Sequence, residues 1–136
     1  MNGPTNWREF SNRLRDAGVD WGLFTVLEVD WDHHVVRRSY SSDEANYPSS
    51  GEKSLMASDW AKHVIFGQSP KFSSDSDSFR RAFSDAELLE SLGLRYALNV
   101  PVLEGARTVR TLNFLRGESV FDAEALKRIN VVLADL

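Results

Sequence analysis

The clearest pattern of apolar and polar positions lies in the segment 90–117. Two apolar runs rich in β-branched and aromatic residues, Tyr96–Leu103 and Thr108–Leu115, flank a short polar turn centred on Gly105. This pattern predicts a β-hairpin, because glycine gives the backbone the freedom that a tight turn needs. We expect this hairpin to organise the rest of the chain.

The two faces of the hairpin differ in polarity. Because side chains alternate along a strand, Leu112 and Phe114 share one face. Thr111 and Asn113 share the other face, and Asn99 adds a further amide to an otherwise apolar run. A polar side chain costs free energy in a dry sheet unless it finds a partner. We therefore expect one face to pack as core and the other to form the floor of a pocket.

The remaining pattern predicts helices at both ends of the chain and short elements between them. The expected helices cover residues 5–17, 59–66, 79–83, 85–92 and 123–136, and the expected strands cover 21–29, 35–41, 96–103 and 108–115. A loop is expected over 42–53, and a short edge strand can begin at Pro70–Phe72. Hairpins without long crossovers favour an antiparallel sheet. The order indicates an α+β fold, an α/β/α sandwich with five to six strands, terminal helices on one face and short helices and loops over the other.

Capping residues mark the expected helix starts. Asn6, Ser58 and Asp122 each precede a helical pattern and can accept a hydrogen bond from a free backbone amide. Ser84 and Glu87 have the spacing of a capping box. The terminal helices each carry one apolar stripe, made by Trp7, Phe10 and Leu14 and by Leu126, Ile129, Leu133 and Leu136.

Composition narrows the classes of protein. The 136 residues suit one domain, and a net charge of −4 argues against a nucleic-acid partner or an anionic membrane surface. The chain contains no cysteine, which excludes disulfides, thiol chemistry and a covalently attached bilin. No apolar run reaches the roughly 20 residues of a membrane span, and the N-terminus lacks a secretory pattern. We expect a cytoplasmic protein.

The second half of the chain carries three short motifs, Ser91-Leu92-Gly93-Leu94, Asn99-Val100-Pro101-Val102 and Thr111-Leu112-Asn113. The first half carries Arg38-Ser39-Tyr40-Ser41-Ser42, Tyr47-Pro48, Gly51-Glu52-Lys53 and Trp60. This ordered set resembles the GAF domain of small, stand-alone bacterial proteins. The resemblance covers about residues 20–136 and implies an α/β/α sandwich with a cavity above the sheet. It also implies a regulatory role and pairing of two copies through the terminal helices.

The candidate site lies between the polar face of the hairpin and a roof formed by residues 42–83. Aromatic walls with a few hydrogen-bonding groups are typical of a small-molecule cleft. An alternative is that Trp60 and Phe79 only plug the roof while the asparagines hold loop backbone. The expected lining residues are Tyr40, Tyr47, Trp60, Phe79, Asn99, Thr111 and Asn113.

Arginines within predicted strands need a partner or an edge position. By alternation Arg110 belongs to the face of Leu112, where it could pair with an acid of a terminal helix. A bulge at Ala106–Arg107 would instead turn Arg110 towards the ligand, where a guanidinium selects a carboxylate or phosphate. We favour the first alternative.

Other chemistry has weaker support. His33 and His34 lie between acidic residues, but Asp in a turn is ordinary local hydrogen-bonding chemistry, which we favour over a metal site. His63 could ligate haem if its helix face met the pocket, yet no second motif supports haem. The cofactor stays unknown. No nucleophile elbow, phosphate-binding loop or metalloprotease motif is present in the sequence.

The sequence thus favours a non-catalytic sensory domain that binds a small organic ligand and signals through its terminal helices. The alternative is a dimerisation or protein-interaction module whose pocket is vestigial. An enzyme that uses Asp, His or Ser in the cleft would need a His–carboxylate or Ser–His pair there.

Overall fold

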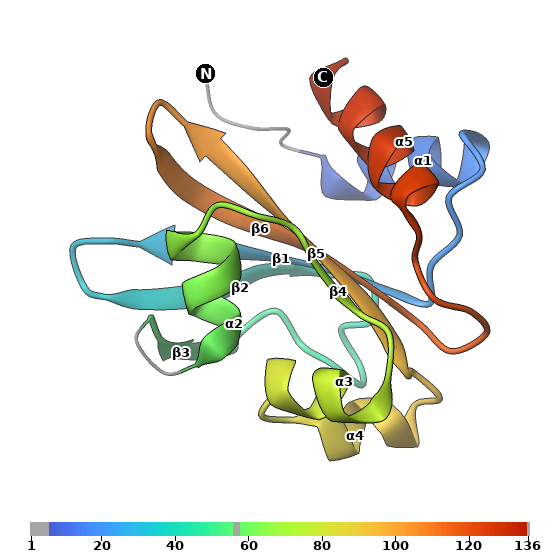
Figure 1. The fold of residues 1–136 in the computed structure, drawn as a ribbon, viewed down its shortest axis with the longest axis horizontal. Helices are drawn as coiled ribbons and strands as arrows, with labels where there is room; N and C mark the ends of the chain where they lie inside the picture. Colours follow the sequence, from blue (N-terminus) through green and yellow to red (C-terminus); the bar gives the residue numbers. More distant parts are fainter. Residues whose placement is uncertain (1–5, 56–57, 136) are drawn as a thin grey trace.

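The computed structural model describes residues 6–55 and 58–135, and its strands form one antiparallel sheet. The strands are β1 (Leu23–Asp30), β2 (Val35–Ser41), β3 (Glu52–Ser54), β4 (Lys71–Ser73), β5 (Tyr96–Glu104) and β6 (Arg107–Arg116). Within the described part of the chain their order is β3-β2-β1-β6-β5-β4, with antiparallel pairing throughout. The predicted antiparallel sheet of five to six strands is confirmed, with the long β5–β6 hairpin inside it (Figure 1).

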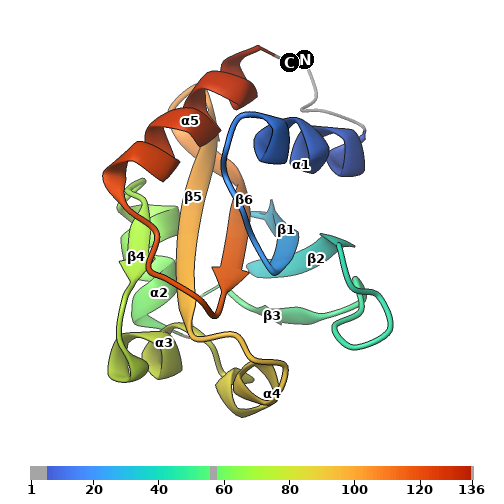
Figure 2. The ribbon, with the colours of Figure 1, turned by 90° about the vertical axis from the view of Figure 1, so that its right-hand side faces the viewer.

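Helices cover both faces of this sheet. They are α1 (Trp7–Asp16), α2 (Asp59–Ala61), the π-helical turn η1 (Lys62–Phe66), α3 (Ser76–Ala82), α4 (Ala86–Ser91) and α5 (Ala123–Ala134). The terminal helices α1 and α5 lie side by side on one face, and α3 and α4 lie on the opposite side (Figure 2). Thr5 and Leu136, where the predicted terminal helices begin and end, lie outside the described residues. No helix in the described ranges is long and apolar enough to cross a membrane.

The face beneath α1 and α5 carries the main apolar core. Phe10 of α1 and Ile129 of α5 are fully buried against it. In the sheet below them, the rings of Phe24 and Phe114 stack with their centroids 4.8 Å apart. Phe114 comes from the strand face that the sequence assigns to core, and Phe10 and Ile129 come from the predicted apolar stripes of the terminal helices, so the predicted packing face is confirmed.

Two smaller apolar clusters lie on the other face. In one, Phe79 of α3 and Leu89 of α4 are buried on the β5–β6 end of the sheet. In the other, Trp60 of α2 and Ile65 of η1 pack against β1 and β2. The roof over this face is therefore split between two groups of short helices.

The predicted caps of three helices are present. Asn6 Oδ1 accepts from the backbone N–H of Glu9 at 3.0 Å, and Asp122 Oδ1 accepts from Ala125 N at 2.9 Å. Ser58 Oγ likewise accepts from Ala61 N, at 3.2 Å. These bonds satisfy amides that have no partner within their helices.

Three middle elements differ from the expectation. The loop expected over 42–53 ends in β3, whose three polar residues pair with β2 and show no alternation of polarity. Helix α3 begins three residues earlier than expected, because Asp75 caps it by accepting from Ser78 N at 2.8 Å. The capping box of Ser84 does not form, since the N-cap of α4 is Asp85 and no side chain caps this helix.

A bulge in β2 changes which side chains face the roof. Val26 pairs with Tyr40, but the next residue of β1, Leu27, pairs with Arg38, so Ser39 is an extra residue in β2. Such a bulge reverses the alternation of side chains. Tyr40 therefore turns towards the terminal helices, where its ring lies 5.7 Å from that of Phe24. The sequence predicted Tyr40 at the pocket. The bulge places its side chain on the opposite face of the sheet instead.

The β5–β6 hairpin turns at Gly105, as predicted, with a positive φ of 65°. The register shift of this hairpin lies between the pairs Val102–Arg110 and Leu103–Thr108, on the turn side of Arg110. Alternation from Arg110 to Leu112 is therefore unbroken, and both side chains lie on the same face. Arg110 Nε lies 3.2 Å from Glu28 Oε1 on the neighbouring strand. The expected face is correct, but the acidic partner comes from a strand and not from a terminal helix.

Gly117, after β6, lies in close backbone contact with Gly93, in the segment after α4. A Cβ on Gly117 would overlap the carbonyl oxygen of Gly93, which itself has a positive φ of 85°. Because that obstacle is backbone, no side-chain rotation could relieve it.

We expect Gly117→Ala to lower the free energy of unfolding by roughly 1–3 kcal/mol, the usual cost of overpacking. Urea unfolding measures this change. Gly105→Asn is the control, because nothing lies within 4 Å of a Cβ there and asparagine tolerates a positive φ. A Gly117→Ala protein as stable as the control would contradict the backbone contact.

Candidate functional site

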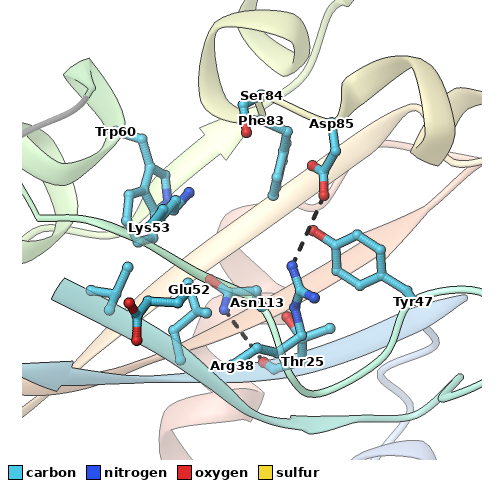
Figure 3. Close-up of a pocket in the computed structure, with 13 residues that line it drawn as sticks. Thr25, Arg38, Tyr47, Glu52, Lys53, Trp60, Phe83, Ser84, Asp85 and Asn113 are labelled. Carbon is cyan, nitrogen blue, oxygen red and sulfur yellow. Dashed lines mark hydrogen bonds and ion pairs between the residues drawn. The ribbon is translucent and has the colours of Figure 1, made fainter.

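A cavity of about 290 Å³ lies between the sheet and the segments that cross its roof (Figure 3). This volume is near the lower end of the range for small-molecule sites, roughly 300–1,000 Å³. Strands β1, β2 and β6 supply the floor, and β3, α2, the loop after β2 and the α3–α4 connection supply the walls. The lining residues are Thr25, Leu27, Val36, Arg38, Tyr47, Gly51, Glu52, Lys53, Trp60, Phe83, Ser84, Asp85 and Asn113.

Asn113 is the central polar group of the floor and is almost fully buried. Its Oδ1 accepts from Asn99 Nδ2 at 2.8 Å and from Thr111 Oγ1 at 3.2 Å. Its Nδ2 donates to the carbonyl oxygens of Thr25 and Thr111, both at 3.4 Å. The amide is thus held in one orientation, with its neighbours in β1 and β5 as partners.

Asn113 belongs to a row of polar residues that crosses the sheet. The strand registers pair Ser41 with Thr25, Thr25 with Asn113, Asn113 with Asn99 and Asn99 with Lys71. Directly paired side chains lie on one face of a sheet, so the row runs beneath the roof across β2, β1, β6, β5 and β4. Only its central part, Thr25 and Asn113, reaches the cavity.

Arg38, Tyr47 and Asp85 form one end of the cavity. The Arg38 guanidinium lies over the Tyr47 ring at 3.8 Å and donates to the Pro48 carbonyl oxygen at 2.6 Å. Its Nη2 lies 3.9 Å from Asp85 Oδ2, as the dashed line in Figure 3 shows. Burial and the hydrogen bond to Asp85 raise the pKa of the Tyr47 hydroxyl, which therefore stays protonated as a donor. Gly51 lies against the guanidinium, since a Cβ there would come within 2.7 Å of Arg38 Nη1.

The local structure explains why Asp85 faces the cavity. Phe83, at the end of α3, is extended, and α4 begins only at Ala86. Asp85 occupies the N-cap position, but its carboxylate accepts no amide of the helix. The carboxylate is instead directed to Arg38 and Tyr47.

Lys53 and Trp60 form the other end of the cavity. Lys53 pairs with Val36 across the β2–β3 ladder, and both residues line the cavity. Its ammonium lies 4.3 Å from the centroid of the Trp60 ring (Figure 3). Burial lowers the pKa of this ammonium, because desolvation disfavours the charged form. The indole Nε1 of Trp60 is buried and has no hydrogen-bond partner among the described residues.

The structure brings three of the seven predicted residues together at the cavity: Tyr47, Trp60 and Asn113. Asn99 and Thr111 lie behind the lining, bonded to the Asn113 amide.

Two other predicted residues lie away from the cavity. Phe79 is fully buried in the roof, as the alternative interpretation held for that residue. Tyr40 lies on the opposite face of the sheet.

The charged residues of the cavity were not predicted as site residues. Arg38 lies within the predicted strand 35–41, but the face on which its side chain lies depends on the bulge in β2. Lys53 belongs to the quoted motif Gly51-Glu52-Lys53, yet it was placed in a loop without a direction. Asp85 lies inside the predicted capping box of Ser84 and Glu87, so nothing in the sequence indicated that its carboxylate faces the cavity.

The histidines lie elsewhere. His33 Nδ1 is 2.8 Å from Asp30 Oδ2 in the β1–β2 turn, and the same carboxylate also accepts from Arg37. His63 Nε2 lies 2.9 Å from the Pro70 carbonyl oxygen. In the described ranges no histidine lines the cavity, and no three His, Cys, Asp or Glu side chains converge to hold a metal.

Comparison with solved structures identifies the fold. The GAF domain of a two-component sensor histidine kinase from Bacillus halodurans is 15% identical, with a TM-score of 0.73 over 95% of this chain and 89% of that chain. A GAF domain/HD domain protein from Geobacter sulfurreducens is 14% identical, with a TM-score of 0.77 over 95% and 85%. GAF3 of Slr1393 from Synechocystis, in its photoproduct state, is 16% identical, with a TM-score of 0.61 over 95% and 87%. No protein-family model and no curated protein matches the sequence. The chain therefore has the GAF fold over almost its whole length.

The buried amide pair supports a double-mutant test. We expect Asn113→Leu alone to cost about 1–3 kcal/mol of unfolding free energy, because it leaves the Asn99 amide buried without an acceptor. Adding Asn99→Leu should recover part of that cost, since replacing both partners of a buried hydrogen bond is far less destabilising. Chemical denaturation of the three variants gives the interaction energy. Strictly additive losses would show that the two amides do not depend on each other.

Proposed function

We propose that this chain is a non-catalytic sensory domain that binds a small organic molecule in the cavity and signals through its terminal helices. The observation that carries this proposal is the cavity itself, which is roofed, lies on a polar floor and has charged groups at both ends. Apolar walls with a few placed polar groups are the usual composition of a small-molecule site. The cytoplasmic location expected from the sequence stays a prediction.

The fold comparison supports a regulatory role. One similar structure is the GAF domain of a sensor histidine kinase. The chain covers nearly all of that domain, so the likeness concerns a whole sensory module and not a fragment of it. We infer the same class of role for this chain.

Strand β6 offers a route from the cavity to the terminal helices. Asn113 lines the cavity, and the next residue, Phe114, packs in the core beneath α1 and α5. A ligand that shifts the Asn113 backbone also shifts the Phe114 ring, which stacks on Phe24. Ligand binding can then favour one arrangement of the helices, provided that it binds one arrangement more tightly.

A metabolite library tested by thermal shift should contain a stabilising compound. A ligand at 100 times its dissociation constant adds about 2.7 kcal/mol to the stability of the folded state, enough to raise the unfolding midpoint by several degrees. Ser84 is exposed at the edge of the cavity. We expect Ser84→Trp to abolish the shift while leaving the unliganded midpoint almost unchanged.

The matched control is Ser119→Trp, an exposed serine in the loop before α5, away from the cavity lining. It should keep the full ligand-induced shift. The proposal is wrong if no compound of a broad library stabilises the chain, or if Ser84→Trp retains the shift.

The outer surface of α5 supports a second role, the pairing of two copies. Val131 is 63% exposed and lies in a shallow apolar groove on this helix. The groove is lined by Ala123, Leu126, Lys127, Asn130, Val131 and Ala134. These positions recur every three or four residues, as on a helix that packs against another helix. We propose that a second copy of the chain covers this stripe and that ligand signals pass through the paired helices.

Sedimentation velocity tests this pairing. We expect a dimer, and Val131→Glu should weaken dimerisation at least about tenfold because it places a charge in an apolar contact. Leu88→Glu is the control, since Leu88 is a similarly exposed apolar residue on α4, beyond the opposite face of the sheet. A monomeric protein at high concentration would exclude homodimerisation, whatever the ligand does.

A further inference from the structure

Two hydrogen-bond donors without acceptors meet at one end of the cavity. The Lys53 ammonium has no ion pair among the residues that the structure describes, and it lies over the face of the Trp60 ring. Trp60 is only 2% exposed, and its Nε1–H is buried without a partner in the same part of the chain. An ammonium and an indole N–H can donate hydrogen bonds but cannot accept them. The group that completes this end must therefore be an acceptor.

Arg38, the cation at the other end of the cavity, already has partners for its guanidinium. Arg38 donates to the Pro48 carbonyl oxygen at 2.6 Å and stacks on Tyr47 at 3.8 Å. Asp85 balances its charge from 3.9 Å. Asp85 also attracts the Lys53 ammonium through space, but no carboxylate of the described residues lies within 4.0 Å of it. Lys53 is therefore the cation of this cavity that lacks a direct ion pair.

The charges of the lining leave a positive excess of one. Arg38 and Lys53 each contribute one positive charge, and Asp85 contributes one negative charge. Glu52 also borders the cavity, but its carboxylate is bonded to the outer Arg37 guanidinium at 2.7 Å. A carboxylate ligand would neutralise this excess, whereas a phosphate monoester, with a charge of about −1.5 to −2 at neutral pH, would exceed it.

We propose that the cavity selects a small organic carboxylate, held by the Lys53 ammonium and the Trp60 indole N–H. This inference rests on the proposed function, because it names the class of ligand for the same site. Leu27, Val36 and Phe83 provide the apolar surface for the organic part of the ligand. Burial already disfavours the charged form of Lys53, and a bound carboxylate would offset that cost. A neutral ligand would leave the ammonium unpaired, and a cation would be repelled by it.

Nuclear magnetic resonance with matched probes tests the inference. Benzoate and benzamide have nearly the same size and shape, but only benzoate carries the charge. The chain contains four tryptophans, so the Trp60 Nε1–H signal can be assigned by its loss in Trp60→Phe. We expect benzoate to shift this signal and to bind more tightly than benzamide or phenyl phosphate by about tenfold or more.

Variants at Lys53 separate its charge from its bulk. Lys53→Met keeps the length and apolar stem of the side chain, and we expect it to weaken benzoate binding about ten- to a hundredfold. Lys53→Arg keeps the positive charge and should retain most of the affinity. Lys62→Met, an exposed position on η1 outside the cavity lining, should bind benzoate like the unmodified chain. An amide spectrum of each variant shows that the fold is intact.

Three results would overturn the inference: equal binding of benzamide and benzoate, undiminished benzoate binding by a folded Lys53→Met protein, or no change of the Trp60 signal with benzoate. The first two would still show that the cavity binds small molecules, so they contradict only the carboxylate. An unchanged Trp60 signal contradicts the carboxylate inference but does not test the sensory proposal. That proposal is tested by the thermal-shift screen of the metabolite library, whose result does not depend on these probes. The two proposals can therefore fail separately.

Discussion

The two faces of strand β6 determine the rest of the structure. Leu112 and Phe114 form the core beneath the terminal helices, while Thr111 and Asn113 lie on the opposite face. A shift of one residue in the register of β6 would exchange the two sets and bury Thr111 and Asn113 against the apolar terminal helices. The bond from Asn99 Nδ2 to Asn113 Oδ1 helps to exclude that shift, because it forms only in the observed register. The same bond fixes the floor of the cavity.

The bulge in β2 gives the cavity its charge without disturbing the core. With regular alternation, Arg38 and Tyr40 would lie on the same face. One extra residue sends Tyr40 to Phe24 in the core and Arg38 to Tyr47 at the cavity. Bulges commonly redirect a side chain next to a functional site. Here the result is a guanidinium held by the Pro48 carbonyl oxygen and facing the Asp85 carboxylate.

The sequence predicts the elements that depend on neighbouring residues and fails where an element depends on residues distant in the chain. The hairpin at Gly105 and the caps at Asn6 and Asp122 depend on neighbouring residues, so they could be predicted. Strand β3 consists of three polar residues and forms through its pairing with β2. No alternation of polarity within these residues predicts a strand. Asp85 faces the cavity through contacts with residues about forty positions earlier in the chain, which no local pattern records. Locally, the spacing of Ser84 to Glu87 suggested a capping box, which does not form. The fold was therefore predictable, whereas the charged half of the site was not.

Lys53 and Trp60 are less stabilising at this end of the cavity than apolar side chains of similar size would be. The half-buried Lys53 ammonium loses part of its hydration, and a buried indole N–H without an acceptor loses a hydrogen bond that it would make in water. A methionine and a phenylalanine could fill the same space without either cost. Side chains that reduce stability are concentrated at sites where they serve another purpose. On the opposite face of the sheet Trp21 also has a buried indole N–H without a partner, but the cation over its ring, Arg15, is exposed and donates to the Trp21 carbonyl oxygen. The Lys53 ammonium has no such acceptor among the described residues, and this distinguishes the wall that it forms with Trp60.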